Sequence, residues 1–268
     1  MILAIDVGNT NIVMGGFEKE GEISFRARLS TNHSKTFEQY AVEIKNILEL
    51  YDIYDEKISG AIISCVVPPL TNAMKNAVEL VTGITPLVVG PGVKTGLNIM
   101  IDNPGQLGSD LVVGAVAALD SYEAPMVIFD LGTATTASVI DADRIFLGGT
   151  IHPGINVSLG ALTSSTSQLP RISMEKPACV IGRNSIDSMT SGIVYGNASM
   201  IDGMVERIEE ELGQHVSVIA TGGLAELITP FCKCKVMLDP DLMLKGLFLI
   251  YRKNMKTVKT NTKTNADL

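Results

Sequence analysis

Residues 130–136 read Asp-Leu-Gly-Thr-Ala-Thr-Thr, and residues 6–10 read Asp-Val-Gly-Asn-Thr, a partial copy of the same motif. Each copy begins with an aspartate that directly follows an apolar run, and a glycine lies two residues after that aspartate. The carboxylate can hold a divalent cation, and the glycine lets backbone N–H groups approach an anion. One such motif is weak evidence, because ordinary turns use the same residues. Two copies at equivalent positions of two halves predict a pair of phosphate-binding hairpins.

The elements around the two motifs predict an α/β fold made of two similar halves. Each half should open with three antiparallel strands, at residues 2–6, 11–17 and 22–29 and at residues 126–130, 134–140 and 144–150. Amphipathic periodicity and helix-start signals predict the main helices at 36–50, 68–81, 109–122, 184–213 and 240–252. We expect an N-terminal half at 1–118, a C-terminal half at 119–254 and a mobile basic tail at 255–268. In such a fold the two hairpins should face each other across a cleft.

The composition fits a globular protein of one large or two ordinary domains, since 46% of the 268 residues are hydrophobic. No apolar run approaches the ~20 residues of a membrane span, and no basic segment precedes the apolar N-terminus as in a signal peptide. We therefore expect a cytoplasmic protein without a membrane partner. The four cysteines are unevenly spaced, and Cys232-Lys-Cys234 lacks a second pair at zinc spacing, so reduced thiols are expected.

The charge is unevenly distributed along the chain. The formal net charge is −8, although residues 252–268 carry five basic side chains and one acidic one. The rest of the chain is therefore strongly acidic, and its field does not attract nucleic acid. An anion such as ATP must then be held by local amides, hydroxyls and a metal ion.

Three further features are candidates for chemistry. Asp110 follows Gly108-Ser109 at a loop–helix junction, where it can either stabilise the helix dipole or act as a general base toward a substrate hydroxyl. Gly222-Gly223 lie between an expected strand and helix, so they allow close approach of a flat ligand such as adenine or form a plain turn. His152 lies beside Pro153 without a paired nucleophile, which is more typical of a hydrogen-bonding loop residue than of a catalyst.

The two hairpin motifs, with Gly108-Ser-Asp110 between them and Gly222-Gly223 after them, resemble type III pantothenate kinase. The resemblance runs from Met1 to about Tyr251. It implies a duplicated actin-like, ribonuclease H-like ATPase fold, with two mixed-sheet halves and helices around a nucleotide cleft. It also implies ATP-dependent phosphorylation of pantothenate to 4′-phosphopantothenate, the first step of coenzyme A biosynthesis, by a homodimer that pairs through the 184–212 region.

The resemblance also assigns roles to residues. Asp110 becomes the catalytic base, Asp130 a ligand of a monovalent cation such as K⁺ or NH₄⁺, and Asp6 the residue that organises Mg²⁺. The implied ATP-binding residues are Asp6, Val7, Gly8, Asn9, Thr10, Asn11, Ile12, Val13, Thr133, Gly222 and Gly223. The implied substrate-binding residues are Met100, Gly108, Ser109, Asp110, Leu111 and Ser185. At a helix start, Ser185 is otherwise simply an N-cap.

Two positions depart from the family pattern. Leu111 stands where the family has an arginine, and Met100 where it commonly has a tyrosine. A leucine cannot replace the bidentate, permanently charged contact of an arginine. Two alternatives therefore stay open beside a pantothenate kinase. One is a non-catalytic or regulatory ATP-binding module of the same superfamily, and the other is a kinase for another small hydroxyl substrate.

Overall fold

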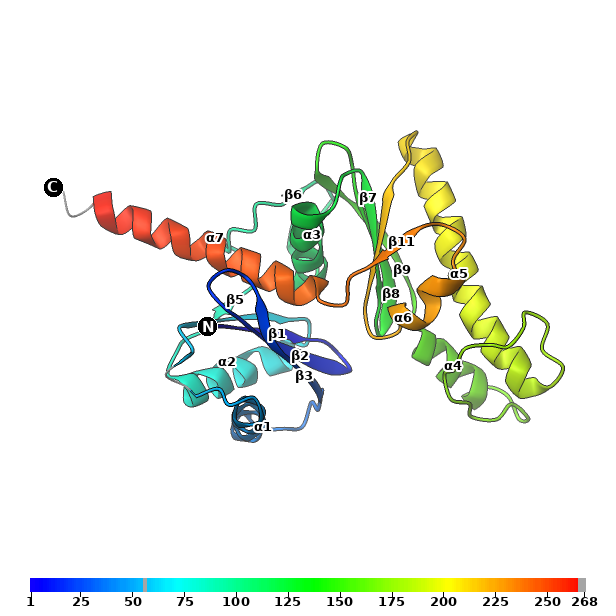
Figure 1. The fold of residues 1–268 in the computed structure, drawn as a ribbon, viewed down its shortest axis with the longest axis horizontal. Helices are drawn as coiled ribbons and strands as arrows, with labels where there is room; N and C mark the ends of the chain where they lie inside the picture. Colours follow the sequence, from blue (N-terminus) through cyan, green and yellow to red (C-terminus); the bar gives the residue numbers. More distant parts are fainter. Residues whose placement is uncertain (55–56, 265–268) are drawn as a thin grey trace. The chain divides into compact units, whose positions relative to one another are not determined.

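The computed structural model describes residues 1–54 and 57–264 (Figure 1). The chain forms two compact units, which we describe separately. Unit 1 comprises Met1–Leu97, Asn103–Ala117 and Leu242–Leu268, and unit 2 comprises Asn98–Asp102 and Ala118–Asp241. Within the described ranges, no helix combines the length and apolar character that crossing a bilayer requires.

Unit 1 is built on a five-stranded mixed sheet with the order β3-β2-β1-β4-β5. Its strands are β1 (Ile2–Val7), β2 (Asn11–Phe17), β3 (Ile23–Ser30), β4 (Gly60–Cys65) and β5 (Leu87–Val88). Strand β2 lies antiparallel to both β1 and β3, whereas β4 lies parallel to both β1 and β5. The opening meander that the sequence predicts is therefore confirmed.

The helices of unit 1 cover the two faces of this sheet. Helices α1 (Phe37–Leu50) and α2 (Pro68–Thr82) pack on one face, and α3 (Ser109–Ser121) and α7 (Leu242–Thr264) on the other (Figure 1). Local signals place their ends. The Thr36 side chain and Gln39 form a capping box at the start of α1, α2 begins at Pro68, and it ends at Gly83 with a φ of 68°.

Strand alternation divides the apolar residues of unit 1 between two cores. Leu3 and Ile5 of β1 belong to the cluster with α1 and α2, whereas Ala4 between them belongs to the cluster with α3 and α7. In this second core the rings of Phe17 and Phe248 are stacked with centroids 4.6 Å apart. Such a pair contributes about 0.5–1.5 kcal/mol beyond its buried area. The face that carries Ala4 is the one that positions the candidate site described below.

Unit 2 contains a six-stranded mixed sheet with the order β11-β10-β7-β8-β9-β6. Its strands are β6 (Asn98–Ile99), β7 (Met126–Leu131), β8 (Ala134–Ile140), β9 (Ile145–Pro153), β10 (Ser217–Thr221) and β11 (Val236–Leu238). Strands β7, β8 and β9 repeat the antiparallel meander, and β10 lies parallel to β7. Unit 2 therefore has the same opening arrangement as unit 1, as the duplicated motif predicts.

The main core of unit 2 lies between the sheet and its helices α4 (Ile155–Ser164), α5 (Ser185–Leu212) and α6 (Ala225–Ile228) (Figure 1). The helical stripe expected on 184–213 is confirmed, and its apolar residues Val194, Ala198, Ile201 and Val205 are buried in this core. A short 3₁₀ turn, Thr229–Phe231, follows α6, and a second one, Pro104–Gln106, precedes α3. The four cysteines are free thiols, as expected.

The closing helix differs from the sequence-based expectation in two ways. It continues to Thr264 rather than ending near Arg252, while residues 265–268 of the expected tail lie outside the described residues. It also groups with unit 1 instead of the C-terminal half, because Leu244, Leu247 and Phe248 pack in the second core of unit 1. A Cβ atom at Gly246 would lie 2.1 Å from the carbonyl oxygen of Val113, so α7 and α3 are in backbone contact there.

One other local expectation was wrong, and one short strand was not predicted. The segment 90–107 contains β6, which pairs with β9 at the edge of the second sheet. His152, expected in a loop, lies in β9 opposite Thr135 of β8. Its Nε2 atom and the Thr135 hydroxyl are buried without a hydrogen-bond partner among the described residues. Pairing with a distant strand, which no local pattern reveals, determines both placements.

Candidate active site

In unit 1 the turn between β1 and β2 has a defined geometry. The Gly8 N–H donates to the Asn11 carbonyl oxygen at 3.0 Å, and a Cβ atom at Gly8 would lie 3.1 Å from that same oxygen. Thr31 fastens the turn from the end of β3: its hydroxyl donates to the Gly8 carbonyl at 2.7 Å and its N–H to the Thr10 carbonyl at 2.9 Å. Asn9 and Thr10 are exposed. A turn whose backbone is fixed by hydrogen bonds and whose polar side chains are exposed suits phosphate binding.

Four polar residues gather at the carboxyl-terminal edge of the sheet in unit 1. Asp6 lies near the end of β1 and is paired in register with Ser64 on β4. The Ser64 side chain is fully buried, and its Oγ lies 3.1 Å from Oγ of Ser109, the first residue of α3. Asp110 follows directly. Ligands of α/β sheets bind at this kind of edge, outside the carboxyl ends of parallel strands.

Asp110 is held in the first turn of α3. Its Oδ1 accepts a hydrogen bond from the Leu111 N–H at 2.8 Å, and a Cβ atom at Gly108 would lie 2.3 Å from that oxygen. Burial raises the pKa of the Asp110 carboxyl above its ordinary value, and this effect exceeds the opposing effect of the backbone hydrogen bonds. A carboxylate with a raised pKa is a stronger base, which is the property that a general base needs.

In unit 2 the turn between β7 and β8 is fixed in a similar way. The Gly132 N–H donates to the Ala134 carbonyl oxygen at 3.1 Å, and the Gly154 N–H donates to the Thr133 carbonyl oxygen at 3.1 Å. A Cβ atom at Gly154 would lie only 2.1 Å from that Thr133 oxygen. Gly154 thus fixes the second turn through a backbone hydrogen bond, as Thr31 fixes the first through its hydroxyl and N–H.

Asp130 occupies the place in unit 2 that Asp6 occupies in unit 1. It lies near the end of β7 and pairs in register with Thr221 on the parallel strand β10. Gly222 follows with a φ of 95°, and a Cβ atom there would lie 2.4 Å from Oδ1 of Asp130 and 2.7 Å from two backbone atoms of Leu131. Gly222 therefore has a structural reason: its backbone passes against the carboxylate, where only a glycine fits.

Asp6 and Asp130, each within its own unit, fit the cations that the resemblance implies. Carboxylate and hydroxyl oxygens are the ligands that hard cations prefer, and Mg²⁺ is commonly held by one or two carboxylates together with substrate phosphates and water. In the described ranges no cluster of three or more His, Cys, Asp or Glu side chains could hold a metal by itself. A single carboxylate, as each unit offers at this place, suits a hard cation that takes its other ligands from phosphates and water.

Ser185 and Met100 are the two remaining predicted site residues outside the turns and α3, and both belong to unit 2. Ser185 is the exposed first residue of α5, and the N-cap is its neighbour Asn184, whose Oδ1 accepts from the Asp187 N–H at 2.9 Å. The simple interpretation of Ser185 as an N-cap is therefore wrong. Met100 is 61% exposed and follows β6, where its N–H donates to the Phe146 carbonyl at 2.9 Å. A cavity of about 650 Å³ is lined by Ser185 but not by Met100 or Asp130.

Sequence reasoning missed three residues that shape these sites: Thr31, Ser64 and Gly154. Ser64 lies inside the buried strand β4, Thr31 after β3, and Gly154 before α4, each far along the chain from the group it supports. Only the Pro153-Gly154 pair carries a local signal, and that signal indicates no more than a turn.

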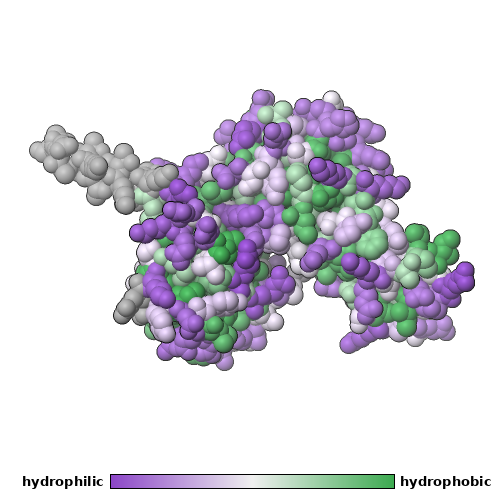
Figure 2. All heavy atoms as spheres, in the orientation of Figure 1, coloured by the Kyte–Doolittle hydropathy of each residue, from purple (hydrophilic) through white to green (hydrophobic). Residues whose placement is uncertain are grey.

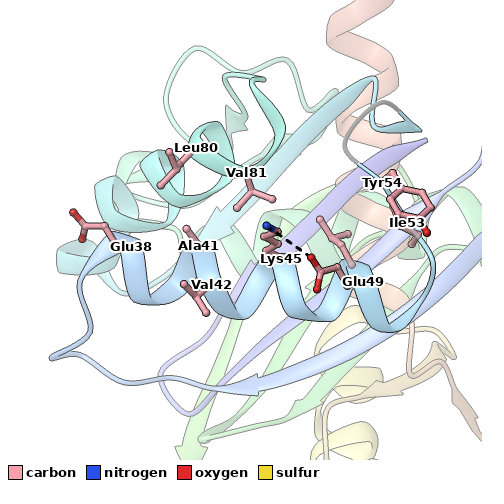
Figure 3. A pocket seen from close by; sticks show the side chains of 10 residues that line it. Glu38, Ala41, Val42, Lys45, Glu49, Ile53, Tyr54, Leu80 and Val81 are labelled. Atoms are coloured by element: carbon pink, nitrogen blue, oxygen red, sulfur yellow. Dashed lines mark ion pairs between the residues drawn. The ribbon is translucent and has the colours of Figure 1, made fainter.

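Another cavity, of about 500 Å³, lies between α1 and α2 (Figure 3). Its walls are mainly apolar, and an ion pair of 3.8 Å joins Lys45 and Glu49 along α1. It contains none of the residues that the motifs single out. We therefore place the candidate active-site residues at the sheet edges and turns described above, not in this cavity.

The two mixed sheets, each opening with a strand that ends in an aspartate and a glycine turn, define an actin-like ATPase fold of the kind found in kinases. Solved structures with this fold include the activator of 2-hydroxyisocaproyl-CoA dehydratase from Clostridium difficile with bound ADPNP, with a TM-score of 0.58 and 12% identity over 98% of this chain and 97% of that one. A Campylobacter jejuni protein that has been proposed to be a Baf family transcriptional activator also has a TM-score of 0.58, with 19% identity over 95% and 99% of the two chains. Component A of (R)-2-hydroxyglutaryl-CoA dehydratase from Acidaminococcus fermentans has a TM-score of 0.55 and 14% identity over 93% and 96%. At these identities the likeness concerns the fold alone.

The family is shown by the sequence match. The family model described as type III pantothenate kinase matches residues 2–207. The chain belongs to the type III pantothenate kinase family, and it is a kinase of the actin-like fold.

Proposed function

We propose that the protein transfers the γ-phosphoryl group of ATP to the terminal hydroxyl of pantothenate, giving 4′-phosphopantothenate. The observation that carries the proposal is the placement of Asp110 in unit 1. Asp110 lies in the first turn of α3, at the sheet edge that also carries Asp6, Ser64 and Ser109. Its carboxylate is partly buried, and burial raises its pKa. The family to which the chain belongs supports pantothenate as the acceptor.

In this proposal each group has one task. Asp110 orients the acceptor hydroxyl and takes its proton as the oxygen attacks phosphorus. The turns at Gly8–Thr10 and Gly132–Thr133 hold phosphate oxygens through their N–H and hydroxyl groups. Asp6 holds Mg²⁺, which offsets the charge of the phosphates when it is bound. Ser109 positions Asp110 through its contact with Ser64.

A coupled assay of ADP release, with and without pantothenate, tests the proposal. We expect release to depend on pantothenate and a phosphorylated product to accumulate. Nucleotide binding without release would favour the non-catalytic module, and release with a different acceptor from a panel of small alcohols would favour a kinase of another substrate. Either result would contradict the proposal.

We further propose that Asp130 binds a monovalent cation. The turns at residues 8–10 and 132–133 contain no lysine or arginine, so they do not offset the negative charge that ATP brings beside two aspartates. Like charges ~4 Å apart repel by several kcal/mol at intermediate dielectric. Activity should therefore require K⁺ or NH₄⁺ as well as Mg²⁺, and Asp130→Asn should lower both the rate and its dependence on K⁺.

The measurement is the initial rate in Mg²⁺ as K⁺ replaces a bulky organic cation at constant ionic strength. Asp143→Asn, at an exposed turn between β8 and β9, is the matched control and should leave the K⁺ dependence unchanged. Full activity of the wild type with only the organic cation present would contradict this assignment.

We also propose that the protein is a homodimer that pairs around the start of α5. Although much of the α5 stripe is buried in unit 2, apolar side chains before and at its start are exposed, including Val180 (62%), Ile181 (82%) and Ile186 (55%). Figure 2 shows hydrophobic surface gathered over the segment between α4 and α5. An exposed apolar patch of this kind commonly marks an interface.

Sedimentation at micromolar concentration should show a dimer for the wild type. Ile181→Asp should shift the equilibrium to monomer, because it places a charge in the apolar contact. Leu50→Asp, at the end of α1 in unit 1 where Leu50 is 80% exposed, should not. A wild type that sediments only as a monomer would count against the dimer.

A further inference from the structure

The segment that joins β3 to α1 connects the core of unit 1 to the turn between β1 and β2. Thr31 holds that turn with two donors, its hydroxyl on the Gly8 carbonyl oxygen and its N–H on the Thr10 carbonyl oxygen. The next residue, Asn32, is held by Tyr40, which lies near the start of α1. The Tyr40 hydroxyl donates to the Asn32 carbonyl oxygen at 2.8 Å and accepts from the Asn32 N–H at 3.0 Å. A chain of hydrogen bonds and adjacent residues therefore leads from the core to the turn, all within unit 1.

The Tyr40 hydroxyl does more than find a partner inside the core. Tyr40 is fully buried and packs in the cluster with α1 and α2. A buried tyrosine needs only one partner for its hydroxyl. Here the hydroxyl uses both its donor and an acceptor lone pair on the backbone of one residue, Asn32, and this double contact fixes the orientation of that residue. An ion pair between Lys35 and Glu43 of α1 holds the same segment against the helix.

The hydrogen bond from Thr31 also sets the direction of an amide in the turn. A trans peptide is planar, so its C=O and N–H groups point in opposite directions. The peptide between Gly8 and Asn9 is trans, since the cis bond found among the described residues is Ala124-Pro125. Because the Gly8 carbonyl points to the Thr31 hydroxyl, the Asn9 N–H points away from Thr31. An N–H group with a fixed direction can donate to a phosphate oxygen at a smaller entropic cost.

We propose that Tyr40 is a positioning residue for nucleotide binding, which acts through Asn32 and Thr31 on the turn at residues 8–10. The inference rests on the proposed function, because that function places the phosphates of ATP at this turn. A binding loop that is ordered in advance binds more tightly, since less conformational freedom is lost on binding. Loss of the Tyr40 hydroxyl should therefore weaken the binding of ATP with Mg²⁺, although the side chain is fully buried and inaccessible to a ligand.

The test compares Tyr40→Phe with Tyr51→Phe in the full-length protein. Tyr51, at the other end of α1, is the matched control, because its hydroxyl donates at 2.6 Å to the carbonyl oxygen of Arg26, in the middle of β3 and away from the turn. Tyr40→Phe should raise the Kd of ATP with Mg²⁺, measured by calorimetric titration, about three- to tenfold, the range expected for one hydrogen bond. The kcat at saturating ATP and the KM for pantothenate should stay near wild type. Tyr51→Phe should bind the nucleotide as the wild type does.

A double-mutant cycle tests the route through Thr31. Thr31→Val removes the hydroxyl and should raise the Kd at least as much as Tyr40→Phe does. Thr31→Ser retains a hydroxyl and should recover most of the affinity. Because residues that act through one another are not additive, Tyr40→Phe added to Thr31→Val should cause little further loss.

Three results would overturn the inference: an unchanged Kd in Tyr40→Phe, an equal loss in Tyr51→Phe, or additive losses in the double variant. Equal affinities of Thr31→Val and Thr31→Ser would overturn it as well, whether or not Tyr40→Phe folds. A wild type that binds ATP but transfers no phosphoryl group to pantothenate would instead contradict the proposed function, and the comparison of Kd values would still decide the role of Tyr40.

Discussion

The variant Asp110→Asn is expected to lose phosphoryl transfer by about 10²–10⁴-fold in kcat, the usual contribution of a general base. The amide has nearly the same shape as the carboxylate and can keep the hydrogen bond from the Leu111 N–H at Oδ1. It cannot accept the proton of the acceptor hydroxyl. Nucleotide binding should stay near the wild-type level, because the phosphate-binding turns are untouched.

The pH dependence gives an independent measurement of the same role. A base works in its deprotonated form, and burial raises the pKa of Asp110. The wild-type kcat/KM should therefore fall as the pH drops through a value above the ordinary range of an aspartate, and the residual rate of Asp110→Asn should lack this step. Asp120→Asn, at the exposed other end of α3, is the control and should behave as wild type. A purified Asp110→Asn protein with more than about half the wild-type rate would rule out the assignment.

A second large effect is expected from Gly222→Ala. The added Cβ would meet Oδ1 of Asp130 at 2.4 Å and the backbone of Leu131 at 2.7 Å, at a residue whose φ is 95°. The backbone strain costs about 1–2 kcal/mol and the crowding about 1–3 kcal/mol, so the free energy of unfolding should fall by roughly 2–5 kcal/mol. Displacement of the Asp130 carboxylate should also lower activity in the fraction that stays folded.

Gly213→Ala separates these two causes. Gly213 ends α5 with a φ of 69°, but nothing lies within 4 Å of a Cβ atom there, so only the strain remains. Denaturant unfolding should show a loss of about 1–2 kcal/mol for Gly213→Ala with activity preserved. Similar losses of stability in both variants, with full activity in each, would show that the close approach of Gly222 to Asp130 affects neither stability nor activity.

The sequence by itself determined the features that depend on neighbours along the chain. Alternating and helical periodicity predicted the strand meanders and the main helices, because burial of one face imposes a period of two or about 3.6 residues. The aspartate–glycine motifs predicted both turns, and Gly108-Ser-Asp110 predicted a carboxylate at the start of α3. The family match and the structure confirm the α/β class and the kinase family.

The tertiary structure alone decided which distant residues support these motifs. Strand register places Ser64 beside Asp6, and the pairing of Ser64 with Ser109 links β4 to the start of α3 across 45 residues of sequence. Packing of Phe248 on Phe17 assigns α7 to unit 1, although the helix comes last in the chain. Such contacts follow from how sheets pair and cores pack, and a local pattern carries no information about the partner. For the same reason, only the folded chain shows Ser185 lining one cavity with Leu162 of α4.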